Sequence, residues 1–467
     1  MSTFTYVEDA IKWWVGVPLV EMHLFDRDGR YFAINVGRHE AVELTESLYQ
    51  CCAFLKSESN AKISEESLLS LVNMGLVKDI RRVASDLVSD VDEIAPDTIA
   101  LFVSQKCNLR CTYCFGVDGS YGDSSVMDDS VGALAVRRLF EWSAGNQVRI
   151  LYFGGEPMMN FSLVKSTAEL ALQLGQQYGV AVQFVMITNG TYLNLENTAW
   201  MTGKNFDVQV SVDGTEEVHN QQRPMLSGKG SYKQTLNGIQ HLKNANISTR
   251  VHAVVSPDVS PIEVYQGLKK LAVKDISVKP SCPVRLKGDG DVAAWDYKLW
   301  NAFNETELRQ AVKTRSHPPK GRISDYLALF LRVERRRYYC GVGKSFVAVD
   351  VAGGIYPCHR FVGDQKWKIG EVQTGLDEKA KSSYIGLTTD NMPQCSTCWA
   401  RNLCGGGCLY EHASRTGDFL QPSLEFCSEV RDAVERAAVV SVDISPDQGS
   451  WVQASFPSES SPKGAFE

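Results

Sequence analysis

The chain lacks the long hydrophobic runs of a membrane protein and the basic surplus of a nucleic-acid binder. It has no uninterrupted apolar run of about 18 residues, the length that a membrane-spanning helix needs. Its first twelve residues carry Glu8 and Asp9 instead of the basic flank and apolar core of a signal peptide. Against 55 Asp and Glu stand only 48 Lys and Arg, a formal charge of −7, whereas phosphate contacts require excess cations. We therefore expect a cytoplasmic protein with no membrane and no nucleic-acid partner.

Cysteine, in contrast, is abundant. The 467 residues include 13 cysteines, an odd number, and a reducing cytoplasm disfavours disulfides. Metal binding or catalysis is therefore the expected use. Ten of the cysteines fall into two tightly spaced groups. Cys51, Cys52 and Cys282 stand apart, and we expect Cys51 and Cys52 to pack in an N-terminal core.

Residues 1–92 have the pattern of a small recognition domain. Residues 18–37 alternate apolar and polar side chains around the turn-forming Asp26–Gly29, which predicts a β-hairpin. Two helices are predicted next, one capped by Thr45 and one running from Ser64 to Gly75. A hairpin followed by small helices resembles the winged-helix element that binds a leader peptide at a sheet edge. The alternative is a packing or dimerisation module.

Residues 93–320 alternate apolar, β-branched runs with longer amphipathic stretches. This pattern predicts an α/β fold with a parallel sheet, open or closed as a partial (β/α)6 TIM-like barrel. Functional residues are then expected at the C-terminal ends of the strands. The six runs are Thr98–Val103, Val148–Phe153, Val182–Ile187, Asp207–Val212, Thr249–Val255 and Asp275–Val278.

The remaining chain changes character twice. Residues 321–444 are rich in Cys and Gly and have too little apolar periodicity to build a large core unaided, so bound metal clusters are expected to stabilise them. Residues 445–467 are rich in Ser, Pro and Gly, and we predict a flexible tail.

The first cysteine group follows the first barrel strand as Cys107, Cys111 and Cys114. Three thiolates on one loop can hold three irons of a [4Fe-4S] cluster and leave the fourth iron open. S-adenosylmethionine (SAM) can chelate that iron, and one electron then splits its sulfonium to give a 5′-deoxyadenosyl radical. The motif, with Tyr113 beside its last cysteine, resembles that of the radical SAM superfamily. Zinc, the alternative, usually takes four ligands and a CxxC knuckle.

Later segments match the same superfamily. The sequence places GGEP after the second strand, TNG after the third and SVDG at the end of the fourth, with HNQQRP next. The resemblance implies that the glycines let the backbone approach SAM and that the glutamate accepts from its amino group. The asparagine and serine would contact ribose or carboxylate, and the arginine would bind the carboxylate. These residues are Gly154, Gly155, Glu156, Asn189, Ser211 and Arg223.

The second cysteine group resembles the C-terminal SPASM domain of radical SAM enzymes that mature peptides and proteins. All seven signature cysteines are present, and a zinc ribbon is the alternative. The resemblance implies two auxiliary iron–sulfur clusters. Their ligands would be Cys395, Cys398, Cys404 and Cys427 for the outer cluster, and Cys340, Cys358 and Cys408 for the inner one.

The inner set is one cysteine short. Sulfatase-maturing relatives carry a further cysteine just before the position of Cys340, whereas residues 333–339 here contain none. Either Cys282 completes the cluster, or an iron stays open for a substrate thiolate, or a different side chain ligates. An open iron would acidify and position a substrate cysteine.

The segment PCHRFVG is typical of thioether-forming peptide maturases, whereas sulfatase maturases have an aspartate at the position of His359. His359 is a catalytic candidate as a proton relay, or it donates a hydrogen bond to cluster sulfur. The chain resembles most the maturation proteins of quinohemoprotein amine dehydrogenase. That implies thioether crosslinks between Cys sulfur and Asp or Glu methylene carbons in a small polypeptide, with or without a leader. It also implies an electron donor such as flavodoxin or ferredoxin. The rivals are carbon–carbon crosslinking, formylglycine formation and a non-catalytic iron–sulfur scaffold that binds peptide.

Overall fold

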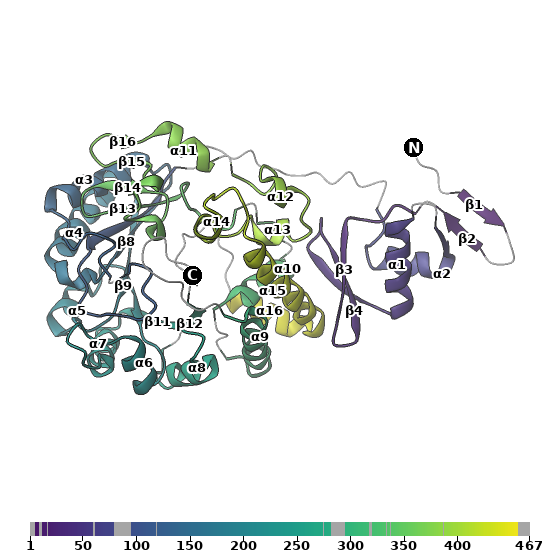
Figure 1. The fold of residues 1–467 in the computed structure, drawn as a ribbon, viewed down its shortest axis with the longest axis horizontal. Coiled ribbons are helices and arrows are strands. Elements are labelled where there is room, and N and C mark those ends of the chain that lie inside the picture. Colours follow the sequence, from purple (N-terminus) through teal and green to yellow (C-terminus); the bar gives the residue numbers. More distant parts are fainter. Residues whose placement is uncertain are drawn as a thin grey trace.

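Six parallel strands lie side by side in one sheet, in the left half of Figure 1. The computed structural model describes residues 5–8, 12–15, 17–58, 61–78, 95–117, 119–273, 275–281, 295–316, 320–332, 334–336, 338–385 and 387–455. Each strand pairs in parallel with the next along the chain. The predicted partial (β/α)6 barrel is therefore confirmed. Its strands are β7 (Thr98–Ser104), β8 (Gln147–Gly154), β9 (Ala181–Thr188), β10 (Phe206–Ser211), β11 (Ser248–Val255) and β12 (Asp275–Pro280).

Helices cover the outer face of this sheet (Figure 1). Every residue of β7 is buried, because the strand is covered on both faces. The helix that follows β8 ends at Gly179, whose φ of +69° suits a left-handed C-cap. The covering helices are α3 (Asp129–Trp142), α4 (Phe161–Tyr178), α5 (Leu195–Met201), α6 (Glu216–Gln222), α7 (Tyr232–Asn244) and α8 (Pro261–Lys269), with a 3-10 turn η1 (Pro157–Asn160).

The cysteine-rich C-terminal part continues the same sheet. Strand β13 (Phe346–Val349) pairs in parallel with β7, and β14 (Gly354–Tyr356), β15 (Gly370–Glu371) and β16 (Gly375–Leu376) follow antiparallel. Its apolar side chains join the barrel core. Its short helices are η2 (His359–Phe361), η3 (Gln365–Trp367), α11 (Glu378–Ile385), α12 (Pro393–Ser396), α13 (Arg401–Cys404) and α14 (Leu409–Thr416).

A second core lies between long helices, and it corrects one prediction. Helices α9 (Tyr297–Thr314), α10 (Arg322–Arg332), α15 (Leu424–Asp443) and α16 (Pro446–Ser455) pack together. The flexible tail predicted from residue 445 is wrong for α16, where Val452 is fully buried. The Ser-Pro pair there starts a helix, because the Ser445 hydroxyl accepts from the Gln448 amide at 3.3 Å and proline suits the first helical turn. Residues 456–467 lie outside the described residues.

The N-terminal part has the predicted hairpin and both predicted helices. Strands β3 (Met22–Arg27) and β4 (Arg30–Asn35) form the hairpin, and β5 (Glu40–Leu44) adds to it. Thr45 caps α1 (Glu46–Ser57) and Ser64 caps α2 (Glu65–Asn73). Strands β1 (Thr5–Glu8), β2 (Lys12–Val15) and β6 (Lys62–Ser64) form a separate sheet. Cys51 and Cys52 contribute to the core of this part.

This N-terminal part contacts the C-terminal cysteine segment directly. The His23 ring stacks on Trp399 with 3.7 Å between ring centroids, and the Arg27 guanidinium donates to Asp432 at 2.9 Å. Its role in leader binding stays a prediction. None of the helices in the described ranges is long and apolar enough to cross a bilayer.

Candidate active site

Three cysteines gather on the loop that follows β7. Burial raises the pKa of the Cys107 thiol to about 12 and that of Cys111 to about 11. Both pKa values are raised further by Cys114, so the three thiols lie within electrostatic reach of one another. Buried thiols resist ionisation, and a bound metal cation reverses this because it stabilises thiolate.

A second group consists of Cys340, Cys358 and Cys408. Cys358 follows β14, and Cys408 is the N-cap residue of α14. Burial raises the pKa of the Cys358 thiol above its usual range, and Cys340 and Cys408 add to this effect. The Arg360 guanidinium donates to Cys408 Sγ at 3.8 Å and to Glu411 Oε1 at 3.0 Å. The three thiols therefore lie in one buried region, next to the Arg360 guanidinium, which Glu411 holds in position.

The third group brings together Cys395, Cys398, Cys404 and Cys427. Burial, and after it the neighbouring thiols, raise the pKa values of Cys395 and Cys404. The tight chain path there depends on glycine. Gly405 has a φ of +72°, and a Cβ on it would lie 2.5 Å from the Tyr338 carbonyl carbon. The cysteines of each set thus lie within electrostatic reach of one another, and their assignment to clusters stays a prediction. Among the described residues no three Cys, His, Asp or Glu side chains converge on a single metal ion, so individual ligand roles stay predictions. Cys282 lies outside the described residues.

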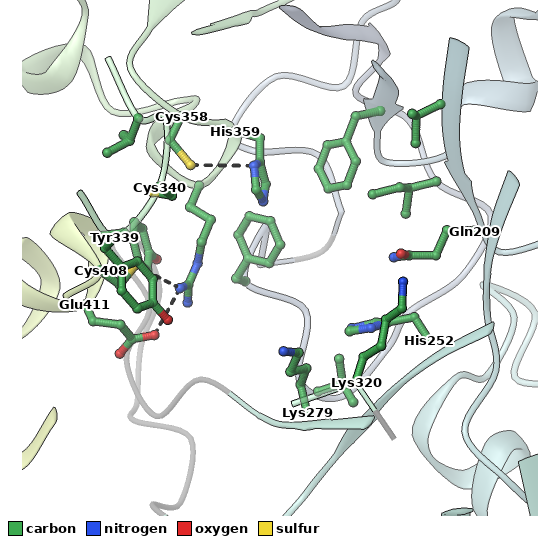
Figure 2. A pocket seen from close by; sticks show the side chains of 18 of the residues that line it. Gln209, His252, Lys279, Lys320, Tyr339, Cys340, Cys358, His359, Cys408 and Glu411 are labelled. Carbon is green, nitrogen blue, oxygen red and sulfur yellow. Dashed lines mark hydrogen bonds and ion pairs between the residues drawn. The ribbon is translucent and has the colours of Figure 1, made fainter. Parts of the chain in front are cut away.

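One cavity of about 1260 Å³ joins the first two groups. All six of their cysteines line it, together with Tyr113 and the ends of β8 to β11. Figure 2 shows Cys340, Cys358 and Cys408 on one wall of this cavity, facing Gln209 and His252 across it. The first and second cysteine groups therefore face one continuous space.

Most of the predicted SAM contacts line this cavity: Tyr113, Gly154, Gly155, Asn189, Ser211 and Arg223. Gly154 needs glycine because its φ is +131° and a Cβ would lie 2.1 Å from the Ser104 carbonyl oxygen. Asn189 is held by its amide, which donates to Asn108 Oδ1 at 2.9 Å. The residues predicted at the ends of β8, β9 and β10 thus line the same cavity.

Glu156 lies between the ends of two barrel strands. It is fully buried and is not among the described lining residues. Its carboxylate accepts from the Thr188 hydroxyl at 2.7 Å and the Asn189 amide at 2.8 Å. Burial raises the pKa of Glu156 to about 7, against these hydrogen bonds. In the structure Glu156 ties the ends of β8 and β9 together, and its contact with the SAM amino group stays a prediction.

The sequence prediction missed Asp213, although it lies in the SVDG segment. This fully buried carboxylate accepts from the Tyr113 hydroxyl at 2.6 Å and from Arg223 Nε at 3.0 Å. The Arg223 guanidinium lies 5.4 Å from the centre of the Tyr113 ring and 3.7 Å from Cys111 Sγ. Asp213 therefore holds the Arg223 guanidinium beside the first thiol group. A guanidinium in that position is suited to bind the carboxylate of a ligand.

His359 lies among aromatic rings. Its ring centre is 5.1 Å from that of Phe153 and 6.1 Å from that of Phe115, and its Nδ1 is 3.5 Å from Cys358 Sγ. Burial, with Arg360 nearby, lowers the pKa of His359 to about 3. A neutral ring next to sulfur favours the hydrogen-bonding alternative over the proton relay.

Gly155→Ala is expected to destabilise the protein by about 1–3 kcal/mol, the usual effect of overpacking. A Cβ there would lie 2.4 Å from the Lys106 carbonyl oxygen and 2.6 Å from that of Gly119, so the cysteine loop must shift. Thermal unfolding measures the loss. Gly145→Ala is the matched control, because its Cβ would meet nothing closer than 3.8 Å. Equal unfolding temperatures for the two variants would contradict the close approach.

Together, a partial (β/α)6 barrel with thiol groups at its strand ends defines a barrel enzyme built to hold iron–sulfur clusters. Residues 101–271 match the Radical SAM superfamily. The chain thus carries a radical SAM domain and is a radical SAM enzyme, and its cofactors are iron–sulfur clusters and SAM.

Curated relatives support this conclusion. The cysteine-type anaerobic sulfatase-maturating enzyme of Clostridium novyi (strain NT) is 24% identical over 327 residues, which cover 65% of this chain and 85% of that protein. The serine-type anaerobic sulfatase-maturating enzyme of Bacteroides thetaiotaomicron is 23% identical over 370 residues, covering 71% and 88%.

Solved structures show the same fold. Native anSMEcpe with bound AdoMet and Cp18Cys peptide superposes with a TM-score of 0.64 at 20% identity, covering 74% of this chain and 98% of that one. SuiB of Streptococcus suis bound to S-adenosylmethionine gives a TM-score of 0.54 at 15% identity, covering 88% and 99%.

Proposed function

We propose that this enzyme matures a small polypeptide by joining a cysteine sulfur to a methylene carbon of an Asp or Glu residue. The resemblance to the maturation proteins of quinohemoprotein amine dehydrogenase nominates the small subunit of an amine dehydrogenase as substrate. One observation carries the proposal: the two three-cysteine groups line a single cavity. A substrate bound there lies between the place where SAM is split and a second place suited to sulfur.

The first cysteine group and the second cysteine group would have different roles. Cys107, Cys111 and Cys114 would hold the first cluster with one iron open, and Arg223, fixed by Asp213, would bind the SAM carboxylate. Cys340, Cys358 and Cys408 would hold the inner cluster. With only three cysteines on the described part of this wall, a ligand position is left for the thiolate of a substrate cysteine.

When bound, the clusters and SAM supply a radical that takes one hydrogen atom from the substrate, and an acceptor for the electron released as sulfur and carbon join. The second hydrogen leaves the thiol as a proton. An unactivated methylene is too weak an acid for a side-chain base tuned near neutral pH, so the reaction needs a radical. Phe115, Phe153 and Tyr121 also line the cavity, and their aromatic rings would keep water from the reacting carbon.

Formylglycine formation is the second candidate, and the names of the relatives favour it. The residue after Cys358 argues against it, because His359 stands where those enzymes, by the resemblance given above, carry an aspartate. His359 is instead held among aromatic rings, with its Nδ1 3.5 Å from Cys358 Sγ.

The partners follow from the same proposal. We infer that the N-terminal part binds a leader segment of the substrate by strand addition, since β3 is an edge strand of its sheet. We also infer that flavodoxin or ferredoxin supplies the electron. The contact of His23 with Trp399 joins this part to the segment that carries the third cysteine group.

The product distinguishes the candidates. With SAM, a reductant and the candidate small subunit, we expect the peptide to lose two hydrogen atoms per crosslink and one alkylatable thiol. Deuterium placed on the Asp or Glu methylene should appear in 5′-deoxyadenosine, which mass spectrometry detects. A carbon–carbon crosslink would leave the thiol free, and formylglycine made from cysteine would lose its sulfur. A scaffold without catalysis would give no 5′-deoxyadenosine above the level without enzyme.

A further inference from the structure

Three exposed apolar side chains lie beside the loop that carries the first cysteine group. Tyr192, Leu195 and Leu226 are 42%, 67% and 62% exposed. They come from two segments, the loop into the first turn of α5 and the turn between α6 and α7, and these helices are neighbours at the lower left of Figure 1. Single exposed leucines are common, whereas apolar side chains that gather in one place mark an interaction surface. We refer to these three residues as the apolar patch.

Both segments of the apolar patch are bonded to Asn108, the residue that follows Cys107. The Leu226 amide donates to the Asn108 carbonyl oxygen at 2.8 Å. The Asn108 side-chain amide donates to the Thr191 hydroxyl at 2.9 Å, one residue before Tyr192. Asn108 is half-buried, so the cysteine loop reaches the surface at this point. The apolar patch thus lies next to the place where the first cluster would be held.

The apolar patch is separate from the cavity. None of its three residues is among the described residues that line the cavity, where SAM and the polypeptide would bind. The reaction has one further participant, the reductant, which must deliver an electron to the first cluster. Because electron transfer slows steeply with distance, the reductant has to dock outside the cavity and close to the cysteine loop. The apolar patch meets both conditions.

Cations border the apolar patch, although the whole chain has a formal charge of −7. Lys229 is exposed and follows Leu226 in the turn between α6 and α7. Arg110 lies on the cysteine loop, where its guanidinium donates to backbone carbonyl oxygens. Neither cation pairs with a carboxylate of the residues that the structure describes. One acid, Glu196, follows Leu195 in α5. Two cations against one acid favour a partner with a negatively charged surface.

We propose that the apolar patch, with Lys229 and Arg110 at its edge, docks a small acidic protein that carries a one-electron redox group. One electron passes from the docked donor to the first cluster, and no proton or atom is exchanged. This assignment rests on the electron donor proposed above and names the surface that receives it. Apolar and aromatic side chains at the centre, with charges at the rim, are the usual composition of a protein interface.

Two reductants test the assignment. Flavodoxin, kept reduced by NADPH and its reductase, is compared with dithionite as the electron source for SAM cleavage by the reconstituted full-length enzyme, and chromatography measures 5′-deoxyadenosine. L226E and K229E place a like charge opposite the acidic donor, so the flavodoxin-driven rate should fall about tenfold. The dithionite-driven rate should stay unchanged, because this small reductant needs no docking surface. Added salt should lower the flavodoxin-driven rate of the unaltered enzyme.

Matched variants separate the apolar patch from the rest of the surface. L299E and K270E make the same substitutions at an exposed leucine of α9 and at the exposed C-cap lysine of α8, and both rates should be kept. An unchanged flavodoxin-driven rate in L226E and K229E overturns the assignment, and if L226E then breaks a dimer seen by sedimentation, the patch binds a second copy. An equal loss with both reductants also overturns it. Thioether formation is not measured, so these outcomes are independent of the proposed crosslink.

Discussion

Cys107→Ala is expected to reduce 5′-deoxyadenosine formation to the level seen without enzyme. Cys107, Cys111 and Cys114 supply every thiol of the first group, and two thiolates cannot hold a four-iron cluster with its open iron at a defined place. The site-bound iron and sulfide should fall as well, because ligand loss and cluster loss are coupled. Chromatography of the nucleoside products under anaerobic, reducing conditions gives the measurement, with iron and sulfide assays beside it.

Cys51→Ala is the matched control for this variant. Cys51 is half-buried in the N-terminal core and belongs to none of the three groups. Its substitution should leave iron content and SAM cleavage unchanged. SAM cleavage at the unaltered rate in Cys107→Ala would remove the basis for the site, as would zinc without iron in protein purified anaerobically.

The barrel could be predicted because its strands are buried on both faces. The segment TIALFVS reads as an apolar run, and all of its residues are buried in β7. The first cysteine group could be predicted equally well, since Cys107, Cys111 and Cys114 lie on one short loop. The other two groups combine cysteines that are far apart in sequence, and only the resemblance to a known family suggested them.

The C-terminal helices could not be predicted in the same way. Helix α15 buries small residues such as Ala433 and Ala437, which give a weak apolar pattern. Its charged residues pair with a distant part of the chain, as Asp432 does with Arg27. The Ser-Pro pair that starts α16 is as typical of a loop as of a helix. Only the burial of Val452 in the structure shows that this segment packs as a helix. Tertiary packing decides these elements.

The direction in which a side chain points was the other feature that could not be predicted from the sequence. Glu156 and Asp213 both follow barrel strands, so either carboxylate was eligible to contact a ligand. In the structure Glu156 turns toward Thr188 and the backbone of Asn189, whereas Asp213 turns toward Tyr113 and Arg223. Only the hydrogen-bond partners, which come from other parts of the chain, distinguish the two.

Cys408→Ala is expected to separate SAM cleavage from crosslinking. Cys408 lies with Cys340 and Cys358, on the cavity wall away from the Cys107 loop. Its loss should spare part of the 5′-deoxyadenosine and lower the thioether product to background, because the substrate sulfur is no longer held and the released electron has no acceptor. The ratio of crosslinked peptide to 5′-deoxyadenosine, measured by mass spectrometry, reports this uncoupling.

Ser414→Ala controls for disturbance of α14, the helix that Cys408 caps. The Ser414 hydroxyl donates only to the Glu411 carbonyl oxygen at 3.2 Å, within the same helix, so the ratio should stay at the unaltered value. A normal product yield in Cys408→Ala would show that the inner group has no part in closing the bond. Loss of both products together would instead mean that the two cysteine groups form one folding unit. The shared sheet of β7 and β13 makes such coupling physically reasonable, and for that reason the ratio, not the yield alone, is the decisive quantity.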